Sequence, residues 1–458
     1  MTAANIGLRG RLLGGADREL LRRVFKIAGP ATAEAILVGL AGLFDTAQVG
    51  TLGTVAVSAV GLTNQPKFIC MAIIISLNVG VTALVARRVG EKDYEGASET
   101  FRQCLFLCFA LSAVILSAAF AFSEPFLRIA GAKEDTIALS ADYFRWLLPG
   151  QFFQHIYLTS NAAMRASGNA RISLQTNLVS SVSNVCMNYL LINGHFGFPA
   201  LGVRGAAIAT SLSFVFAFLV ALVSLRSRAC LLNVRTRRGW LPTRNLIMRL
   251  RGVAVSALIE NVCLRVGFFT YARIVAGLGT VAFAAHQICM NITNVSLLSF
   301  DGLGNAAAAL VGQDLGAQKP DRAHTAAETC VRLALIYSVG LMAVLCLFRG
   351  PIIRIFSRDP AVVVPATRIL LFLAASAIGD ALCVVHAGAL RGAGDTKFVA
   401  FASLLSVTII RPLLSWTLCY PVGLGLYGPW IGFLLDLWTR GFLNTLRFFQ
   451  GRWKTIRL

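Results

Sequence analysis

The stretch Leu52–Ala56, LGTVA, occurs a second time as Leu278–Ala282, 226 residues further along the chain. Two other pairs of similar stretches have the same offset. They are ARRVGEKDYEGA at 86–97 with GQDLGAQKPDRA at 312–323, and MRASGNA at 164–170 with LRGAGDT at 390–396. Three pairs with one common offset, spread over more than a hundred residues without a net insertion, are unlikely to arise by chance. The sequence therefore predicts a duplicated protein.

The composition is that of a membrane protein. Hydrophobic residues make up 56% of the chain and charged residues only 14%, whereas soluble domains carry about 25% charged residues. Apolar runs of about 20 residues are long enough to cross a bilayer. Twelve such runs occur, near 30–50, 55–82, 103–122, 136–160, 172–193, 205–225, 252–275, 282–311, 333–348, 360–388, 398–420 and 427–446.

These runs predict an all-α polytopic membrane protein with twelve transmembrane helices in two pseudo-symmetric six-helix lobes. Because six is an even number, both halves enter the bilayer in the same orientation. We expect a pseudo-two-fold axis along the membrane normal, with the substrate route between the halves.

The basic residues indicate the orientation. Lys and Arg gather at the N-terminus, in the connector between the halves and in alternate loops, which places both termini on the cytoplasmic side of the inner membrane. This distribution explains the net charge of +21 without a nucleic-acid partner. The expected parts are a cytoplasmic segment 1–29 without a signal peptide, helices 1–6 in 30–225, a basic cytoplasmic linker 226–251, helices 7–12 in 252–448, and a cytoplasmic tail 449–458.

Four carboxylates lie well inside the predicted spans: Glu34, Asp45, Glu260 and Asp380. Ionisable residues in hydrocarbon are costly and are candidates for function; a structural ion pair is the alternative. The offset of 226 relates Glu34 to Glu260, and Asp45 to Tyr271. In each first helix the two positions are 11 residues apart, about 16 Å along one face.

Glu260 lies in SALIENVCLRVGFF, residues 256–269. Arg265 is five residues away and lies off the face of the glutamate, so the partner of Glu260 must come from elsewhere. Ser256, Glu260, Gly267 and Tyr271 form a stripe of polar and small residues, and we expect this stripe to face a hydrated interior.

Asn184 and Asn188 share one face of the fifth span. They either line the interior of the first half or join helices by hydrogen bonds. Asp301 and Asp436 lie nearer to span edges or Gly-rich turns, so they carry less weight as candidates.

Several classes of function are disfavoured. The dipeptide Gly-Lys is absent, which excludes a Walker A loop. The five His and eleven Cys residues have no metal-ligand spacing, and no nucleophile with a nearby base suggests an enzyme. No cofactor is expected.

The chain resembles the multidrug and toxic compound extrusion (MATE) family of secondary transporters. The resemblance covers nearly the whole sequence and rests on GLFDTAQVGTLGTVAVSAVG after residue 41, RRVGEKDYEGA, the region from MRASGNA to GVRGAAIATSLS, GLGTVAFAAHQICMN and GALRGAGDTK.

The resemblance implies roles for particular acids. Asp45 matches a first-span acid tied to ion or proton coupling, and Glu260 with Asp380 matches a cation-binding region of one branch. A Na⁺ ion near these two residues is therefore expected if the chain uses Na⁺. The family often has an acid where Asn188 stands, and this departure shifts weight to Asp45, Glu260 and Asp380.

We therefore expect a monomeric exporter that exchanges inward-moving H⁺ or Na⁺ for amphipathic, often cationic small molecules. Glu34, Asn184, Asn188 and Tyr271 are candidates to line the substrate cavity. The alternative is a flippase for lipid-linked or polysaccharide precursors, which a basic central patch would favour.

Overall fold

The structure is a computed structural model that describes residues 18–129, 134–227, 230–236, 239–357 and 359–456. The chain divides into two compact units. One unit is Ala33–Ala254, here called the N-lobe, and the other is Met1–Thr32 with Val255–Leu458, here called the C-lobe. The expected segment 1–29 is described from residue 18 onward, where it forms the first turns of a long helix.

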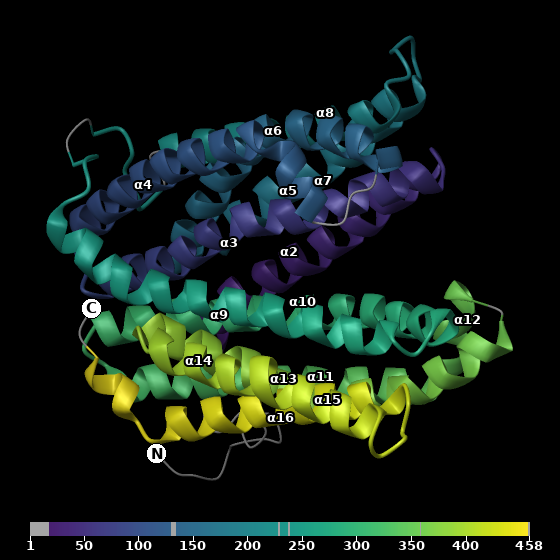
Figure 1. The fold of residues 1–458 in the computed structure, drawn as a ribbon. Helices are drawn as coiled ribbons and strands as arrows, with labels where there is room; N and C mark the ends of the chain where they lie inside the picture. The colour runs from purple at the N-terminus through teal and green to yellow at the C-terminus, as the bar shows by residue number, and fades with distance from the viewer. Residues whose placement is uncertain (1–17, 130–133, 228–229, 237–238, 358, 457–458) are drawn as a thin grey trace. The chain divides into compact units, whose positions relative to one another are not determined.

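All regular elements in the described residues are helices (Figure 1). Those of the first half are α2 (Arg18–Gly50), α3 (Thr54–Gly90), α4 (Tyr94–Ala121), α5 (Ser123–Ile129), α6 (Glu134–Ala166), α7 (Ala170–Asn193) and α8 (Gly202–Arg226). Those of the second half are α9 (Arg244–Ala276), α10 (Thr280–Gly316), α11 (Pro320–Leu347), α12 (Arg349–Phe356), α13 (Pro360–Ala393), α14 (Thr396–Ser403), the π-helix η1 (Leu404–Ile410), α15 (Arg411–Cys419), α16 (Tyr427–Phe449) and the 3₁₀-helix η2 (Arg452–Thr455).

The helix bounds repeat with the sequence offset. The long helices α2, α3, α4, α6 and α7 begin 226 residues before α9, α10, α11, α13 and α14. The repeated LGTVA stretch forms the turn before α3 and α10, where Gly53 and Gly279 have φ angles of 96° and 95°. A side chain is strained in this region of φ, and glycine is not. The turn before each helix therefore requires glycine at the second position of LGTVA.

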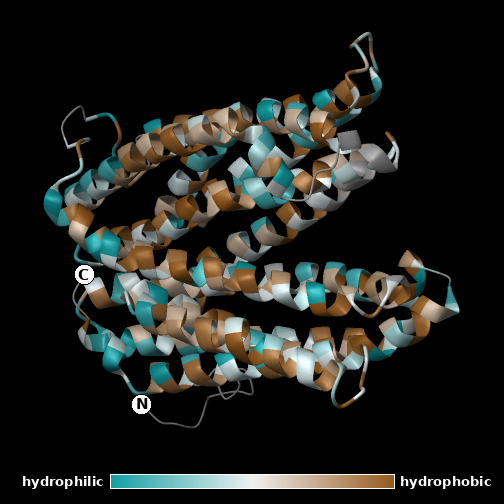
Figure 2. Cartoon of the chain, viewed as in Figure 1, coloured by the Kyte–Doolittle hydropathy of each residue, from teal (hydrophilic) through white to brown (hydrophobic). Residues whose placement is uncertain are grey.

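The fold class predicted from the sequence is confirmed. Nine helices in the described residues are long and apolar enough to cross a membrane. The long helices α6, α7 and α16 are not among the nine, and they carry many of the buried polar residues described below. Figure 2 shows hydrophobic residues over much of the length of the long helices and hydrophilic residues concentrated toward helix ends and loops.

The predicted span 398–420 is not one regular α-helix. The seven residues Leu404–Ile410 form a π-helix between α14 and α15. Gly267 of α9 lies against this segment, because a Cβ atom there would be 2.4 Å from the Val407 carbonyl oxygen. π-Helical turns shift the register of a helix and are frequent at functional sites. Here the π-helix is followed directly by Arg411, a fully buried residue and the first of α15.

Glycines bring the C-lobe helices close together. A Cβ atom on Gly388 or Gly392 of α13 would lie 2.2 Å or 2.1 Å from a carbonyl oxygen of α10. On the next face, a Cβ atom on Gly441 of α16 would lie 2.7 Å from the carbonyl oxygen of Gly379 in α13. Small residues permit such close backbone approach in membrane proteins. As a result α13 is held tightly between α10 and α16.

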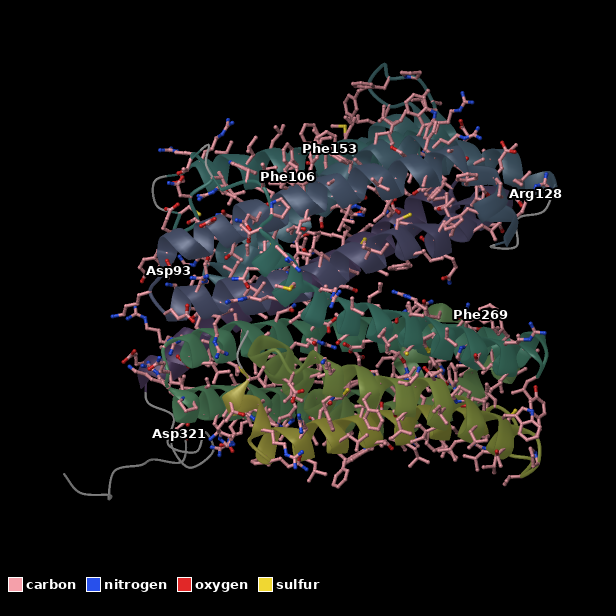
Figure 3. The ribbon with its side chains drawn as sticks, turned by 60° about the vertical axis from the view of Figure 1, so that its left-hand side comes forward. Asp93, Phe106, Arg128, Phe153, Phe269 and Asp321 are labelled. Carbon is pink, nitrogen blue, oxygen red and sulfur yellow. The ribbon has the colours of Figure 1, made fainter. Side chains whose placement is uncertain are left out.

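Each lobe also has an apolar core. In the N-lobe, residues of α3, α6, α7 and α8 pack around Leu147, Tyr157 and Phe214. In the C-lobe, Tyr271, Trp430 and Phe433 lie in a cluster with residues of α10 and α13. Side chains cover the helices on all sides in Figure 3, where Asp93 and Arg128 mark opposite ends of the N-lobe.

Candidate functional site

A cavity of about 210 Å³ lies inside the C-lobe. Its polar lining side chains come from α9, α10, α13, α14, α15 and α16, and they are Glu260, Asp301, Asp380, Arg391, Ser403, Arg411, Arg440 and Asn444. The close glycine contacts of α13 with α10 and α16 explain why Asp380 shares this cavity with Asp301 and Arg440. The structure thus brings Glu260 and Asp380 to one cavity, although 120 residues separate them.

Glu260 has its partner on another helix. Arg391 of α13 binds the carboxylate through two nitrogen atoms on one edge of its guanidinium group. Nη2 donates to Oε1, and Nε donates to Oε2 over 3.3 Å. The hydroxyl of Ser403 donates to Oε1 over 3.5 Å. Glu260 is 4% exposed, so its buried charge is compensated by an ion pair.

A second ion cluster lies beside the cavity. Asp436 of α16 and Arg411 of α15 are both fully buried and form an ion pair. Arg440, one turn after Asp436, also binds this carboxylate over 3.1 Å. The Ser406 hydroxyl in the π-helix donates to the same group. Asp436 therefore holds two guanidinium groups at the edge of the cavity.

Asp380 differs from these paired acids. It is 3% exposed, and its Oδ2 atom has no hydrogen-bond partner among the described residues. Arg440, Asp301 and Asp436 are close enough to interact with it electrostatically. The Oδ1 atom of Asn444 and the Nη1 atom of Arg411, also in the lining, have no partner either. Buried polar atoms of this kind favour a bound ion, proton or water.

The charges around the cavity do not cancel. In the described residues, the lining and the adjacent ion cluster contain four carboxylates, those of Glu260, Asp301, Asp380 and Asp436. They contain three guanidinium groups, those of Arg391, Arg411 and Arg440. With all groups ionised, one negative charge remains. The cavity can therefore take up one proton or one monovalent cation and become neutral.

The N-lobe has its own partly buried polar cluster around Asp45. The Nδ2 atom of Asn188 donates to Oδ1 of Asp45 over 2.7 Å and contacts Oδ1 of Asn184 at 3.3 Å. Asn184 donates in turn to the Thr210 hydroxyl of α8 over 3.1 Å. Lys67 of α3 lies within electrostatic range of Asp45. Asp45, Asn184 and Asn188, identified separately in the sequence, thus form one cluster.

Glu34 is paired with an arginine in the same way as Glu260. The Nη1 atom of Arg165 donates to Glu34 over 3.0 Å, and Asn177 of α7 donates over 2.9 Å. Arg165 and Asn177 are 226 residues before Arg391 and Ser403. Each lobe therefore repeats an acid of its first helix, an arginine of its fourth span and a polar residue of its fifth span. The Ser173 hydroxyl adds a further hydrogen bond of 2.6 Å in the N-lobe.

Tyr271 is 1% exposed and lies among aromatic side chains. Its ring centroid is 5.2 Å from that of His286 and 6.3 Å from that of Phe433. The guanidinium carbon of Arg411 lies 5.8 Å from the Tyr271 ring centroid. The stripe that contains Ser256, Glu260, Gly267 and Tyr271 thus faces the packed interior of the C-lobe, and Glu260 is its member in the cavity lining.

Sequence reasoning missed the three arginines and gave too little weight to Asp301 and Asp436. Arg391 stands in LRGAGDT, which contributed to the internal repeat and not to the list of candidate residues, and Arg411 and Arg440 lie inside predicted spans. Arginine within an apolar span is as costly as an acid. A search for intramembrane cations as well as acids would have found them. No group of three or more His, Cys, Asp or Glu side chains arranged to hold a metal ion occurs in the part of the chain that the structure describes.

Comparisons with known proteins agree with this architecture. The family model described as MatE matches residues 30–190 and 256–417. The chain is 30% identical over 446 residues to "Probable multidrug resistance protein NorM" of Thermotoga maritima, with 95% of this chain and 94% of that protein covered. It is 29% identical over 415 residues to "Multidrug resistance protein PmpM" of Pseudomonas aeruginosa, covering 89% and 84% of the two chains.

A solved structure has the same fold. It is described as the outward-facing conformation of a multidrug resistance MATE family transporter of the MOP superfamily. The TM-score is 0.87 at 21% sequence identity, and the match covers 96% of this chain and 98% of the other.

Proposed function

The chain belongs to the multidrug and toxic compound extrusion family of multi-pass membrane transporters, and from that premise we propose that it is a cation-coupled antiporter. It exports amphipathic, often cationic organic compounds by alternating access, driven by an inward gradient of H⁺ or Na⁺. The names of its relatives, which are multidrug resistance proteins, support this class of substrate.

The unpartnered Oδ2 atom of Asp380 carries this proposal. It lies buried in a cavity whose charged groups leave one negative charge uncompensated. A transporter can use such a site because binding of one cation or proton there biases the protein toward the state with the higher affinity. We assign the coupling step in the C-lobe to Asp380 with Glu260 beside it.

Asp45 acts in the same process in the N-lobe. Its partners Asn188 and Asn184 are neutral amides, so gain or loss of a proton on Asp45 changes the net charge of its hydrogen-bonded cluster. Asn184, Asn188, Glu34 and Tyr271 support the buried polar interiors of the lobes. We propose that the protein works as a monomer in the inner membrane. The basic terminal and connecting segments support an orientation with both termini in the cytoplasm.

The test uses purified protein in proteoliposomes loaded with a fluorescent organic cation. An imposed H⁺ or Na⁺ gradient should drive counter-transport of the dye, and dye should in turn drive ion flux. The Asp380→Asn variant should lower gradient-driven transport by about 100-fold or more, the scale on which loss of a proton-transfer group acts. Asp321→Asn, at a surface carboxylate that pairs with Lys454, is the matched control.

Two results would contradict the proposal. One is dye movement in the wild-type protein that neither gradient changes. The other is full gradient-driven transport by correctly inserted Asp380→Asn protein.

A further inference from the structure

We propose that Arg391 is an ion-selectivity residue: its guanidinium group occupies the cation position at Glu260, so that the C-lobe cavity accepts a proton and rejects Na⁺. This inference rests on the proposed function, because it names the coupling ion of the same site. It follows from the contacts of Arg391, from the oxygen atoms that remain free and from the charge of the cavity.

The contacts of Arg391 fill the carboxylate of Glu260. Nη2 and Nε bind the two oxygen atoms side by side, the Nε contact being 3.3 Å long. A guanidinium group matches a carboxylate in this two-point arrangement better than a point charge does. Because Arg391 is attached to the protein, its effective concentration at Glu260 is high. A Na⁺ ion must displace it before Glu260 can serve as a ligand.

Arg391 removes both oxygens of Glu260 from the set that could hold a hard cation, which leaves the carboxylates of Asp301 and Asp380 and the amide oxygen of Asn444 in the lining. Among the lining atoms that the structure describes, the fully buried oxygens without a partner are Oδ2 of Asp380 and Oδ1 of Asn444. Hard cations are held by several oxygen ligands at once. A proton needs a single carboxylate oxygen, and Asp380 provides one. The cavity therefore suits a proton while Arg391 stays on Glu260.

The charge of the site leads to the same result. Arg391 cancels the charge of Glu260, and Arg440 with Arg411 holds Asp436 and faces Asp380. Removal of the Arg391 charge would leave two uncompensated negative charges around the cavity and free both oxygens of Glu260. Glu260, Asp380 and Asn444 would then supply oxygen ligands together. Such a cavity should bind Na⁺.

The N-lobe supplies a matched control. Arg165 binds Glu34 at the equivalent repeat position, and Asp45, the acid assigned to coupling in this lobe, binds Asn188 instead. Loss of Arg165 also removes the arginine that pairs with a partly buried acid of a first helix. It should disturb the structure to a similar degree without changing which ion drives transport.

The experiment measures two quantities for each variant in proteoliposomes and in detergent. One is export driven by a Na⁺ gradient at equal pH on both sides. The other is Na⁺ binding, followed by calorimetry or by the fluorescence of the C-lobe tryptophans. Arg391 competes with Na⁺ for Glu260, so the apparent Na⁺ affinity of the wild type is reduced in proportion to the fraction of time that Glu260 is unpaired. We therefore expect Arg391→Gln to bind Na⁺ about tenfold or more tightly than wild type.

The expected pattern is specific. Wild-type protein and Arg165→Gln respond to a pH gradient and not to Na⁺, whereas Arg391→Gln gains Na⁺-driven export. The double variant Glu260→Gln with Arg391→Gln removes the pair together and should not gain Na⁺ binding, because the freed ligand is absent. Arg391→Lys keeps the charge but not the two-point contact, so its Na⁺ affinity should rise by a smaller factor.

These outcomes separate the inference from the proposed function. Na⁺-driven export by the wild-type protein would overturn the inference and leave cation-coupled antiport standing. So would unchanged Na⁺ affinity in both Arg391→Gln and Arg391→Lys, and the lysine variant decides the matter if the glutamine variant does not fold. If neither gradient drives wild-type export, the proposed function fails and the inference fails with it.

Discussion

The two lobes share one plan of helices but stabilise their buried polar groups by different means. Around Asp45 the N-lobe forms its hydrogen bonds with the neutral side chains of Asn188, Asn184 and Thr210, and Lys67 lies within electrostatic range. The C-lobe uses ion pairs in its fifth and sixth spans, where Asp436 of α16 is bound by Arg411 and Arg440. The position of Asp45 is taken by Tyr271, whose hydroxyl group has no partner among the described residues.

This difference shows which features the two duplicated halves share and which differ between them. Both lobes keep a polar interior between the first, fifth and sixth spans, but the acid lies on the first span in one lobe and on the sixth in the other. The arginine pairs of Glu34 and Glu260 are the part that both lobes retain. A fold that is symmetric in its backbone therefore carries an asymmetric charge distribution.

The largest expected effect tests the contrast between charged and neutral clusters. Asp436→Asn leaves Arg411 and Arg440 without their shared carboxylate, and loss of one partner of a buried ion pair costs about 3–5 kcal/mol. Thr210→Val in α8, the sixth span of the N-lobe, removes one neutral hydrogen-bonding group and should cost about 1 kcal/mol. Thermal unfolding of the purified variants in detergent measures both. Equal losses would mean that the two clusters contribute to stability in the same way.

The next prediction concerns helix packing. Gly392 of α13 approaches α10 so closely that a Cβ atom would lie 2.1 Å from the carbonyl oxygen of Ala308. The equivalent N-lobe residue is Ala166, so the N-lobe accommodates the methyl group that the C-lobe excludes. Gly392→Ala should destabilise the protein by about 1–3 kcal/mol, as overpacking does.

Gly340 of α11 provides the control, because no atom lies within 4 Å of its would-be Cβ. Gly340→Ala should leave the unfolding temperature unchanged or raise it. If Gly392→Ala unfolds at the same temperature as Gly340→Ala, then α10 and α13 can separate without cost. In that case their close contact would not be what positions Asp380 beside Asp301.

The sequence predicted the spans because their signals are local. Hydrophobic runs and the offset of 226 do not depend on how helices pack, and the helix bounds repeat with that offset. The π-helix Leu404–Ile410 was not predicted, since a shift in hydrogen-bond register leaves no trace in an apolar run. It matters for the site because the next residue is Arg411, the partner of Asp436.

Partners across helices could be predicted only in part. The sequence indicated that the partner of Glu260 lies elsewhere, but Arg391 is 131 residues away and meets it only through the packing of α9 and α13. Asp436 was given little weight because it was placed near a span edge, yet it is fully buried. The cluster of Asp45 with Asn188 was easier to anticipate, since intramembrane polar groups on facing helices seek one another.

A third prediction compares the amide cluster of the N-lobe with the fifth span of the C-lobe. Asn188→Ala removes the amide that donates to Asp45 over 2.7 Å. Hydrogen bonds to charged groups contribute about 1.5–3 kcal/mol, so ion-driven export should fall by about tenfold. Leu414 of α15, in the fifth span of the C-lobe, is the control because its side chain has no polar group, and Leu414→Ala should have little effect on coupling. Dye export in proteoliposomes at equal protein content measures this, and a similar fall in both variants would remove Asn188 from the coupling site.

The smallest expected effect concerns equivalent helix starts, at Asp93 before α4 and Lys319 before α11. The Oδ1 atom of Asp93 accepts a hydrogen bond of 2.9 Å from the Gly96 amide, while Lys319 makes no such side-chain bond. The Gly96 amide, helped by Arg88, holds the pKa of the Asp93 carboxyl below its usual value. Loss of an N-cap side chain costs about 1 kcal/mol, so Asp93→Ala should lower stability slightly at neutral pH and Lys319→Ala should not.

A carboxylate with a lowered pKa stabilises the folded state fully above its unfolded pKa, and this contribution is lost as the pH falls through the folded-state pKa. The difference between wild type and Asp93→Ala in unfolding temperature should therefore be constant from pH 8 to about pH 5 and shrink below about pH 4. A difference that persists unchanged in acid would show that the aspartate acts through contacts other than its ionised cap.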